Sequence, residues 1–578
     1  MILQALVRYY EDLAKQGKIA RHGWAKAKIN YALCINERGE LEQVIPLLEQ
    51  KDGAKKTQPQ QFDLPASASR HGKVLKPNFL WDNATYLLGI NGKKPLSETT
   101  EYFKESGRFH AELLSGIESP TAKAILAFYR NWDPCLAEND PVLSGEYSKI
   151  IQGATLLFRV NGLFAHDDPL LQQAWQKYYN ANSEDGIIRQ CLVSGEQEPI
   201  AKTHPDIHGI GEKSSSTLVG FNAPAFCSYG QEQSYNAPVG KYAAFAYTSA
   251  LNYLLAAREG DHRVAQKIGD TTVVCWAEGA EPQYQTFTLA ALMGTQEKTI
   301  SEDDVRSAVK RLAEGLPVEE LHLKPNQPFY ILGLSPNAAR LSVRFFYQGS
   351  FGDLMKNINA HHERMEIVRP SFDKYETIPL WAMLKETVNP KSRDKTASPV
   401  LAGATARSIF TGGLYPAALL EQTMLRIRAE RNINRGKAAI IKAYYLRNPN
   451  EDCPKEVLTV ALNEASTNPA YTLGRLFSVY EAIQESANPG INTTIKDKYF
   501  NSASSTPASI FPVLDNLCQK HLRKLSTGSR IWYEKQIMEL TNVLGEEYPA
   551  RMTLPQQGSF NLGYYHQTQK RYEKKEEK

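Results

Sequence analysis

The sequence has few cysteines and places them far apart. Its seven cysteines include no Cys-x-x-Cys pair, which argues against a disulfide framework and against an intact zinc knuckle. No stretch approaches the roughly 18 consecutive apolar residues that a membrane-spanning helix needs. Residues 1–20 mix apolar and charged side chains at helical spacing, so they lack the unbroken apolar core of a signal peptide. We therefore expect a cytoplasmic protein with no membrane partner.

The sequence also lacks the common catalytic signatures. It contains no Gly-x-x-x-x-Gly-Lys-Ser/Thr phosphate loop and no Gly-x-Ser-x-Gly nucleophile elbow. His166-Asp167 resembles the first half of a metal phosphohydrolase site, but divalent catalysis needs three or more ligands at fixed geometry. We favour a surface turn for this pair, and we expect no catalytic residue, no metal and no cofactor. A nuclease with dispersed ligands, His166 and Asp167 among them, stays the alternative function.

Neither sign of charge dominates, with 67 Lys and Arg against 63 Asp and Glu. Affinity for a polyanion therefore depends on where the cations lie. Residues 424–448 hold seven cations, the single acid Glu430, and the interleaved Tyr444 and Tyr445. This composition suits a phosphate backbone and exposed bases, although charge runs are more often solvated helix faces. We expect nucleic-acid contact here, with Arg426, Arg428 and Arg431 as candidates, and a solvated face as the alternative.

A second candidate is the polar loop, residues 222–239. Glu232 is its one charged residue, and amide, hydroxyl and ring groups are abundant. Such groups can read base edges, and a ring can wedge between base pairs. A packed structural loop fits the same composition equally well. From the residues alone, a nucleic-acid-binding scaffold is favoured over an enzyme.

Length and patterning predict an α+β protein. The 578 residues allow about three or four domains. Hairpins are expected at residues 28–48, at residues 156–165 around Asn161-Gly162, and at residues 329–347 with Ser335-Pro336-Asn337 between the arms. In the last arm, alternation places Arg340 and Arg344 on one exposed face.

Strand signals stop at a segment of linker composition between Pro390 and Pro399. Beyond it, Asn468-Pro469 and Thr506-Pro507 predict helix starts, and two apolar stripes follow them, Leu473 to Ile483 and Ile510 to Leu522. The expected fold class is α+β, with a β-rich mixed N-terminal region followed by an all-α C-terminal bundle of about four helices. The expected domains are residues 1–390, a linker and basic helical segment at 391–454, and the bundle at 455–578.

Segments spread over nearly the whole chain resemble one known family. They are Met1-Ile2-Leu3-Gln4-Ala5-Leu6, residues 76–89 (KPNFLWDNATYLLG), 231–255 (QEQSYNAPVGKYAAFAYTSALNYLL), 332–345 (LGLSPNAARLSVRF), 438–448 and 495–504. No single segment is specific, but together and in order they are. On these residues the chain resembles the large subunit of the type I-C CRISPR surveillance complex (Cascade), the Csd-type large subunit family.

The resemblance implies a non-catalytic subunit bound to a CRISPR RNA ribonucleoprotein with backbone subunits and a handle-binding subunit. It implies recognition of the protospacer-adjacent motif (PAM) on double-stranded target DNA, help in opening the duplex, and recruitment of a separate helicase-nuclease. It also implies a C-terminal bundle like the complex's small subunit, which in this subtype is translated from within the same gene. Family members often have more cysteines around Cys191, and this sequence departs from them there.

Within that resemblance, the expected PAM readers carry donors or acceptors in the N-terminal loop and strand and in the polar loop. They are Lys73, Lys76, Asn78, Asn83, Ser234 and Asn236. Phe226 or Tyr229 is the expected wedge. Arg340 and Arg344 are expected on the phosphate backbone, and the bundle is expected to guide the displaced strand. Its candidates are Lys520, Arg523 and Lys524.

The small subunit has a candidate start within this sequence. Lys455-Glu456-Val457 is encodable by codons that form a bacterial ribosome-binding site, and Val460 is encodable by the alternative start codon GTG. Initiation there would release residues 460–578. The alternative is that Lys-Glu-Val is merely a common tripeptide and that no translation starts at Val460.

Overall fold

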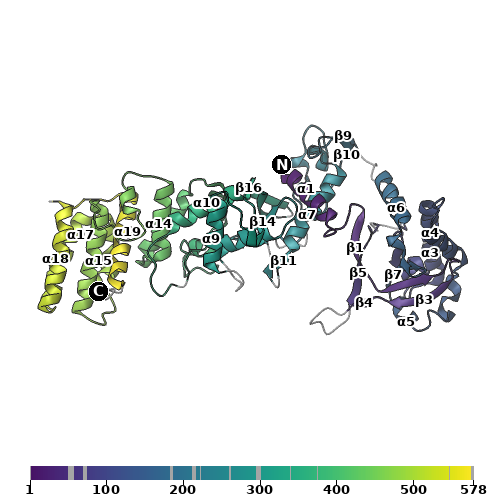
Figure 1. Ribbon diagram of the computed structural model, residues 1–578, viewed down its shortest axis with the longest axis horizontal. Helices are drawn as coiled ribbons and strands as arrows, with labels where there is room; N and C mark the ends of the chain where they lie inside the picture. The colour runs from purple at the N-terminus through teal and green to yellow at the C-terminus, as the bar shows by residue number, and fades with distance from the viewer. Residues whose placement is uncertain are drawn as a thin grey trace. The chain divides into compact units, whose positions relative to one another are not determined.

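The computed structural model describes residues 2–49, 58–68, 75–182, 187–210, 216–221, 223–259, 262–263, 265–294, 301–338, 340–373, 375–545 and 547–573. The chain forms two compact units, whose elements are labelled in Figure 1. Unit 1 comprises Met1–Pro205 and Val219–Leu251, and unit 2 comprises Asp206–Leu218 and Asn252–Lys578. The boundaries predicted at residues 390 and 454 both lie within unit 2.

Unit 1 is built on a five-stranded sheet of order β3-β2-β7-β6, with β8 paired to β7. β2 and β7 run parallel, and the other pairs are antiparallel. Helix α4 packs on β2 and β7, and Leu33, Phe128 and Phe158 are buried in this core. The elements are β2 (Tyr31–Ile35), β3 (Leu41–Pro46), β6 (Trp81–Asn83), α2 (Ala84–Leu87), α3 (Leu96–Leu114), α4 (Pro120–Asn131), α5 (Tyr147–Ile150), β7 (Thr155–Val160), β8 (Leu163–Phe164) and α6 (Pro169–Asn182).

Both hairpins predicted in this unit are confirmed. β2 and β3 pair directly. Asn161 and Gly162 connect β7 to β8 with φ angles of 47° and 84°, and positive φ at both central residues is what a type I′ turn requires. A separate three-stranded sheet joins β1 (Trp24–Ile29), β5 (Gln58–Pro65) and β4 (Leu48–Glu49).

The rest of unit 1 surrounds a short hairpin, β9 (Ile188–Gln190) with β10 (Gln197–Pro199). The polar loop follows, with two 3-10 turns, η3 (Pro224–Phe226) and η4 (Gln233–Asn236), and leads into α7 (Lys241–Ala256). Helix α1 (Ile2–Lys15) packs on the start of α7, because the Tyr10 ring meets the rings of Tyr242 and Phe245 edge-on at 6.2 and 5.5 Å.

Unit 2 begins with an antiparallel sheet of order β13-β14-β15-β16. Its elements are the ribbon β11 (Arg258–Glu259) and β12 (His262–Arg263), then β13 (Gln266–Ile268), β14 (Thr271–Ala277), α8 (Gln283–Met293), α9 (Glu302–Ala313), β15 (Pro328–Asn337), β16 (Arg340–Ser350) and α10 (Phe351–Met365).

The β15–β16 hairpin turns later than predicted. Ser335, Pro336 and Asn337 lie inside β15 and pair with Ser342, Leu341 and Arg340, so the chain reverses between Asn337 and Arg340. A bulge after Gly333 shifts the alternation. For this reason Val343 is 43% exposed next to the exposed Arg344, although strict alternation would place the two on opposite faces.

After Ser350 the described residues form helices and no further named strand, which confirms the α+β class with a helical C-terminal region. The helices are α11 (Leu380–Lys385), α12 (Pro399–Thr411), α13 (Ala417–Glu430), α14 (Arg435–Arg447), α15 (Pro469–Ala487), α16 (Ile495–Ser505), α17 (Pro507–Leu522), α18 (Thr527–Leu544) and α19 (Leu554–Tyr572). Among the described helices, none has both the length and the apolar character needed to cross a bilayer.

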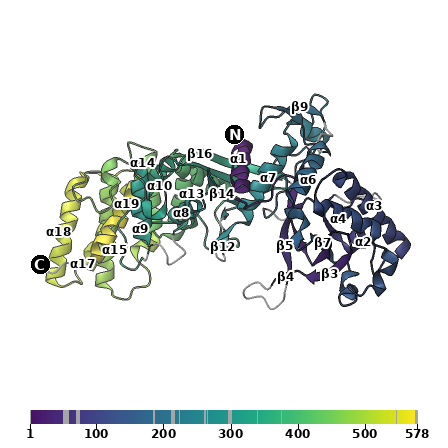
Figure 2. The same ribbon diagram turned by 45° about the vertical axis from the view of Figure 1, so that its right-hand side comes forward.

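Helix α19 is the centre of this helical region. Figures 1 and 2 both show it beside α15, and two glycines allow the close approach. A Cβ on Gly474 would lie 2.0 Å from the Phe560 carbonyl oxygen, and a Cβ on Gly563 would lie 2.0 Å from the Tyr471 carbonyl oxygen. Every residue from Gln557 to Gln567 is buried.

The opposite side of α19 packs on elements that precede residue 454. Arg428 donates a hydrogen bond to Gln557 Oε1 (2.6 Å), and the Tyr565 hydroxyl donates one to the Val368 carbonyl (2.7 Å). One continuous core therefore runs across the predicted start of the bundle.

The apolar stripe of α15 is buried as predicted, whereas that of α17 is rotated. Its buried residues are Pro507, Phe511, Leu514, Cys518 and Leu522, and Val513 is 42% exposed. Val513 precedes the buried Leu514 by one position, which turns it about 100° away from the core, whereas Ile510 is partly buried against the core.

Candidate nucleic-acid interface

Backbone hydrogen bonds hold the polar loop against the β9–β10 region. The Leu192 N–H donates to the Pro238 carbonyl (2.9 Å), the Ala201 N–H to the Val239 carbonyl (3.0 Å), and the Ser234 N–H to the Lys202 carbonyl (3.2 Å). The loop is thus fixed at its C-terminal end and near its middle.

Asn236 organises the loop from within. Its Oδ1 accepts a hydrogen bond from the Ser228 N–H (2.8 Å), and its Nδ2 donates to the carbonyls of Gln231 (3.0 Å) and Gln233 (2.8 Å). These bonds use both ends of the side-chain amide. Asn236 therefore shapes the loop, and a base can reach its amide only by displacing one of these bonds.

Tyr229 projects from the tip of this loop. The turn from Ser228 to Gln231 is closed by a hydrogen bond from the Gln231 N–H to the Ser228 carbonyl (2.9 Å). Tyr229 and Gly230 have φ angles of 51° and 68°, and the Tyr229 side chain is 98% exposed. Phe226, the other wedge candidate, ends η3 and is 44% exposed. Tyr229 is therefore the more exposed of the two wedge candidates, and it lies on a loop held by backbone and side-chain hydrogen bonds.

The remaining predicted PAM readers are mostly built into the fold. Asn78 is buried, and its Oδ1 accepts a hydrogen bond from the Ala68 N–H (2.9 Å). Asn83 caps α2 by accepting from the Thr85 N–H (3.0 Å). Ser234 is buried and Lys76 is exposed, while Lys73 lies outside the described residues. For Asn78, Asn83 and Ser234 these placements favour structural roles over base reading.

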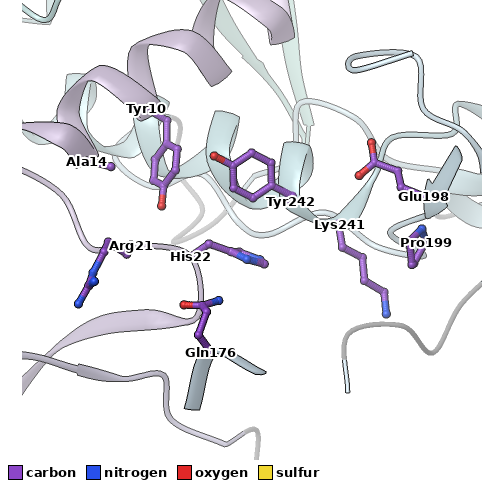
Figure 3. Close-up of a pocket in the computed structure, with 9 residues that line it drawn as sticks. All are labelled: Tyr10, Ala14, Arg21, His22, Gln176, Glu198, Pro199, Lys241 and Tyr242. Atoms are coloured by element: carbon purple, nitrogen blue, oxygen red, sulfur yellow. The ribbon is translucent and has the colours of Figure 1, made fainter. Parts of the chain in front are cut away.

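A cavity that sequence analysis missed lies in unit 1, beside the start of α7 (Figure 3). Its volume is about 480 Å³, and its lining includes Arg21, His22, Gln176, Lys241 and Tyr242. The His22 ring contacts Tyr179, Tyr242 and Phe245 edge-on, and burial lowers its pKa below the ordinary value. The five named residues come from three separate stretches of chain, so no local motif indicates the cavity.

Cys191 has a structural role beside the polar loop. Its Sγ accepts hydrogen bonds from the backbone N–H groups of Val193 (3.3 Å), Ser194 (3.5 Å) and Gly240 (3.1 Å). Ser194 occupies the position where a second cysteine would complete a Cys-x-x-Cys pair. Within the described residues, no group of three or more His, Cys, Asp or Glu is placed to hold a metal ion.

The His166-Asp167 pair lies in a 3-10 turn, Ala165–Asp167, and Asp167 is exposed as predicted for a surface turn, but His166 is buried. His166 is 9% exposed and its ring contacts those of Phe62 and Phe164, because the turn folds back onto β5 and β8. Burial lowers the pKa of His166 despite Asp167, whose Oδ1 lies 3.5 Å from His166 Nε2.

The basic segment turns several of its cations inward. Arg435, Lys437 and Lys442 on α14 are all under 8% exposed. Lys437 pairs with Glu430, and Lys442 Nζ donates to the carbonyls of Glu363 (3.3 Å) and Arg364 (3.0 Å). Arg435, Lys437 and Lys442 are therefore satisfied within the fold, and they are not exposed for the nucleic-acid contact that we expect of residues 424–448.

The three candidates on and after α13 have different surroundings. The Arg426 side chain is 11% exposed and lies 3.6 Å from Glu430. Arg428 is exposed and bonds Gln557, and Arg431 is exposed in the left-handed position that ends α13 (φ 51°). Arg428 and Arg431 thus stay the accessible candidates of this segment.

The other predicted backbone contacts lie at the surface to different degrees. Arg340 is half-buried. Arg344 is 40% exposed in its side chain, and its Nη2 donates to Asp270 Oδ2 (3.3 Å) and Ser335 Oγ (3.1 Å). Lys520, Arg523 and Lys524 are all exposed where α17 ends.

Comparison with known proteins agrees with the resemblance seen in the sequence. No curated protein matches the chain. A family model described as CRISPR-associated protein (Cas_Csd1) matches residues 6–572, which is nearly the whole chain and includes both units. The protein therefore belongs to the Csd1 family of CRISPR-associated proteins.

Proposed function

We propose that this protein is the large subunit of a type I-C CRISPR surveillance complex in the cytoplasm. It recognises the PAM on double-stranded DNA, helps to open the duplex and form the R-loop, and recruits a separate helicase-nuclease. It breaks no covalent bond itself. Its other partners are the backbone and handle-binding subunits of the CRISPR RNA ribonucleoprotein and the small subunits. Family membership supports this assignment.

The observation that carries the proposal is the pinned loop with Tyr229 at its tip. Exchange of a DNA duplex for an RNA–DNA hybrid is nearly balanced in free energy, so modest protein contacts decide whether opening starts. Insertion of a ring costs a few kcal/mol of base stacking. A flexible loop would move away from the duplex before its ring could separate two stacked base pairs. The hydrogen bonds of Asn236 and Ser234 instead hold the loop, and with it Tyr229, in place.

Tyr229→Ala in the assembled complex tests this role. We expect R-loop formation on a PAM-bearing duplex to slow about tenfold, since a stacked ring contributes about 1–3 kcal/mol. Fluorescence of 2-aminopurine beside the PAM reports the opening. Tyr229→Phe keeps the ring and should open DNA at the wild-type rate. On a target with a preformed bubble, Tyr229→Ala should form the R-loop at the wild-type rate as well. If Tyr229→Ala opens the intact duplex at the wild-type rate, the wedge assignment is wrong.

We also propose that the bundle is made separately from a start at Val460. Residues 460–578 contain α15 to α19, including the close α15–α19 pair. Synonymous recoding of the codons for Lys455 to Val457 and for Val460 should abolish a short C-terminal product on an immunoblot. Persistence of that product after recoding would refute the proposed start.

A further inference from the structure

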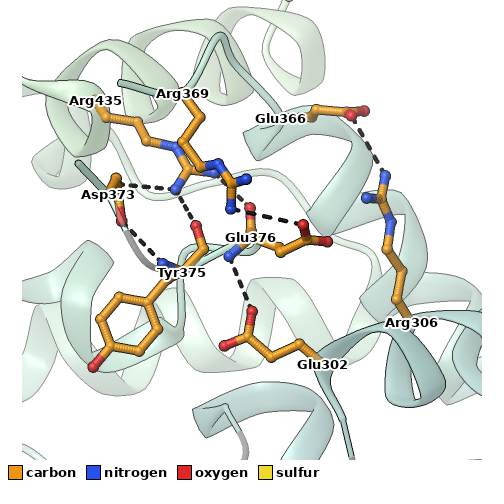
Figure 4. Close-up of polar contacts among 8 residues, drawn as sticks. All are labelled: Glu302, Arg306, Glu366, Arg369, Asp373, Tyr375, Glu376 and Arg435. Atoms are coloured by element: carbon orange, nitrogen blue, oxygen red, sulfur yellow. Dashed lines mark hydrogen bonds and ion pairs between the residues drawn. The ribbon is translucent and has the colours of Figure 1, made fainter. Parts of the chain in front are cut away.

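Residues 366–373 and 375–379, which we call the strap, lie between α10 and α11 and are held in place by Arg435. Figure 4 shows the Arg435 guanidinium beside three strap residues, Asp373, Tyr375 and Glu376. Nη1 donates to Asp373 Oδ2 (3.0 Å) and to the Tyr375 carbonyl (2.6 Å), and Nη2 donates to the Glu376 carbonyl (2.5 Å). Arg435 itself is 7% exposed, so these bonds are shielded from water.

Further contacts hold the strap along its length. Its Val368 N–H donates to the Val460 carbonyl (2.8 Å). Its Glu376 N–H donates to Glu302 Oε2 (2.9 Å), and its Glu366 carboxylate lies 3.4 Å from Arg306. The strap lacks regular secondary structure, yet its backbone is tied to α9, to α14 and to the segment before α15.

The strap and the helix after it expose three aromatic side chains. Phe372 is 84% exposed, Tyr375 is 48% exposed, and Trp381 on α11 is 45% exposed. The rings of Tyr375 and Trp381 lie 6.2 Å apart at 84°. We call these three residues the aromatic patch. Aromatic rings usually stabilise a protein by being buried. A cluster of rings that a fixed backbone keeps exposed to solvent therefore indicates a binding surface.

The charges around the aromatic patch favour an anionic partner. The acids at the strap all have partners: Asp373 pairs with Arg435 (3.0 Å), Glu376 with Arg369 (3.7 Å) and Glu366 with Arg306 (3.4 Å), and Glu302 accepts the Glu376 N–H (2.9 Å). Lys385 is exposed one helical turn after Trp381. Between residues 380 and 398, all of which the structure describes, the exposed cations are Lys385, Lys391, Arg393 and Lys395, against one exposed acid, Asp394.

We propose that the aromatic patch, with Lys385, binds single-stranded DNA by stacking its bases on the rings. Stacking accepts every base, and the cations hold the phosphates. Unpaired bases are needed because a duplex keeps its base faces covered. If the proposed function holds, the ligand is a strand displaced from the target duplex, but the binding itself requires no PAM.

The test uses the purified full-length chain and a fluorescein-labelled oligothymidylate, with binding measured by anisotropy. Phe372→Ala with Tyr375→Ala should weaken binding about tenfold or more. Tyr375→Phe keeps the ring and should bind as the wild type does. Trp532→Ala is the matched control, since Trp532 is 54% exposed on α18 and should leave binding unchanged.

A second pair of variants tests the electrostatic part. Lys385→Glu should weaken oligonucleotide binding and reduce the slope of log Kd against log salt by about one phosphate contact. Lys535→Glu, at a lysine that is 72% exposed on α18, should weaken binding less than Lys385→Glu does. Equal effects of the two reversals would indicate general attraction and overturn the assignment of Lys385.

The outcomes separate this site from the wedge. The wedge is tested by 2-aminopurine fluorescence in a duplex, whereas the patch is tested by oligothymidylate binding without a duplex, so each proposal can fail without the other. If the double variant binds oligothymidylate as the wild type does, the patch is not a DNA site. If the double variant still binds DNA but no longer associates with another subunit of the complex, the patch is a protein interface and the proposal is wrong.

Discussion

Lys442 shows what the basic residues of α14 do in this fold. Lys442 is 3% exposed, and its ammonium donates hydrogen bonds to two backbone carbonyls at the end of α10. Burial lowers the pKa of Lys442 to about 8 from an ordinary 10.5, and nearby Glu366 only partly offsets this effect. The lysine therefore ties α14 to α10 at a cost in desolvation.

That lowered pKa predicts how stability changes with pH. Between about pH 8 and 10 the unfolded chain keeps the proton on Lys442, whereas the folded chain releases it. The contribution of Lys442 to the free energy of unfolding therefore increases as the pH rises. Relative to Lys442→Met, the wild type should become more stable by up to about 1.4 kcal/mol per pH unit across this window. Urea unfolding of both proteins at several pH values measures the difference. A constant difference from pH 7.5 to 10 would contradict the buried, titrating lysine.

The same residues show why this part of the site could not be predicted from composition. The sequence places seven cations in residues 424–448 with one acid, which is typical of a solvated or nucleic-acid-facing helix. The partners of Arg435 and Lys442 lie about 60 to 80 residues earlier in the sequence. They are the Asp373 carboxylate and the backbone carbonyls of Tyr375 and Glu363. Only the tertiary fold reveals that Arg435 and Lys442 are satisfied internally.

At the scale of elements, the α15–α19 pair depends on two glycines. Because a Cβ at Gly474 would meet the Phe560 carbonyl at 2.0 Å, an alanine forces the two backbones apart. Gly474→Ala should destabilise the protein by about 2–3 kcal/mol. Gly528→Ala on α18 has nothing within 4 Å of the added Cβ and should be neutral or stabilising by less than about 1 kcal/mol. Thermal unfolding compares the two, and equal melting temperatures would argue against the close contact.

Turn chemistry decided which elements could be predicted. Asn161-Gly162 predicts its hairpin because both residues readily adopt positive φ. The β15–β16 hairpin instead reverses between Asn337 and Arg340, after the Ser335-Pro336-Asn337 triplet that has the stronger turn propensity. Helix starts were more reliable, since Asn468 does cap α15 by accepting a hydrogen bond from the Tyr471 N–H (2.9 Å).

At the scale of the whole molecule, the two units carry different candidate surfaces. Unit 1 carries the polar loop with Tyr229, and unit 2 carries the aromatic patch and the cations at the end of α17. Composition indicated the polar loop as a candidate nucleic-acid contact, because amide and ring side chains are frequent in this nearly uncharged stretch. It gave no sign that Tyr229 alone would project fully, since that depends on the hydrogen bonds of Asn236 with Ser228, Gln231 and Gln233.

The central claim is that this chain helps to open target DNA and leaves its cutting to a partner. The most direct measurement uses the assembled complex without its helicase-nuclease, mixed with target duplex and Mg²⁺. Permanganate reports unpaired thymines, and a denaturing gel of the same sample without permanganate reports strand length. We predict reactive thymines on the displaced strand only when the PAM is present, with both strands intact. Opening that ignores the PAM, or cleavage that persists with the chain alone and a divalent metal, would contradict the claim.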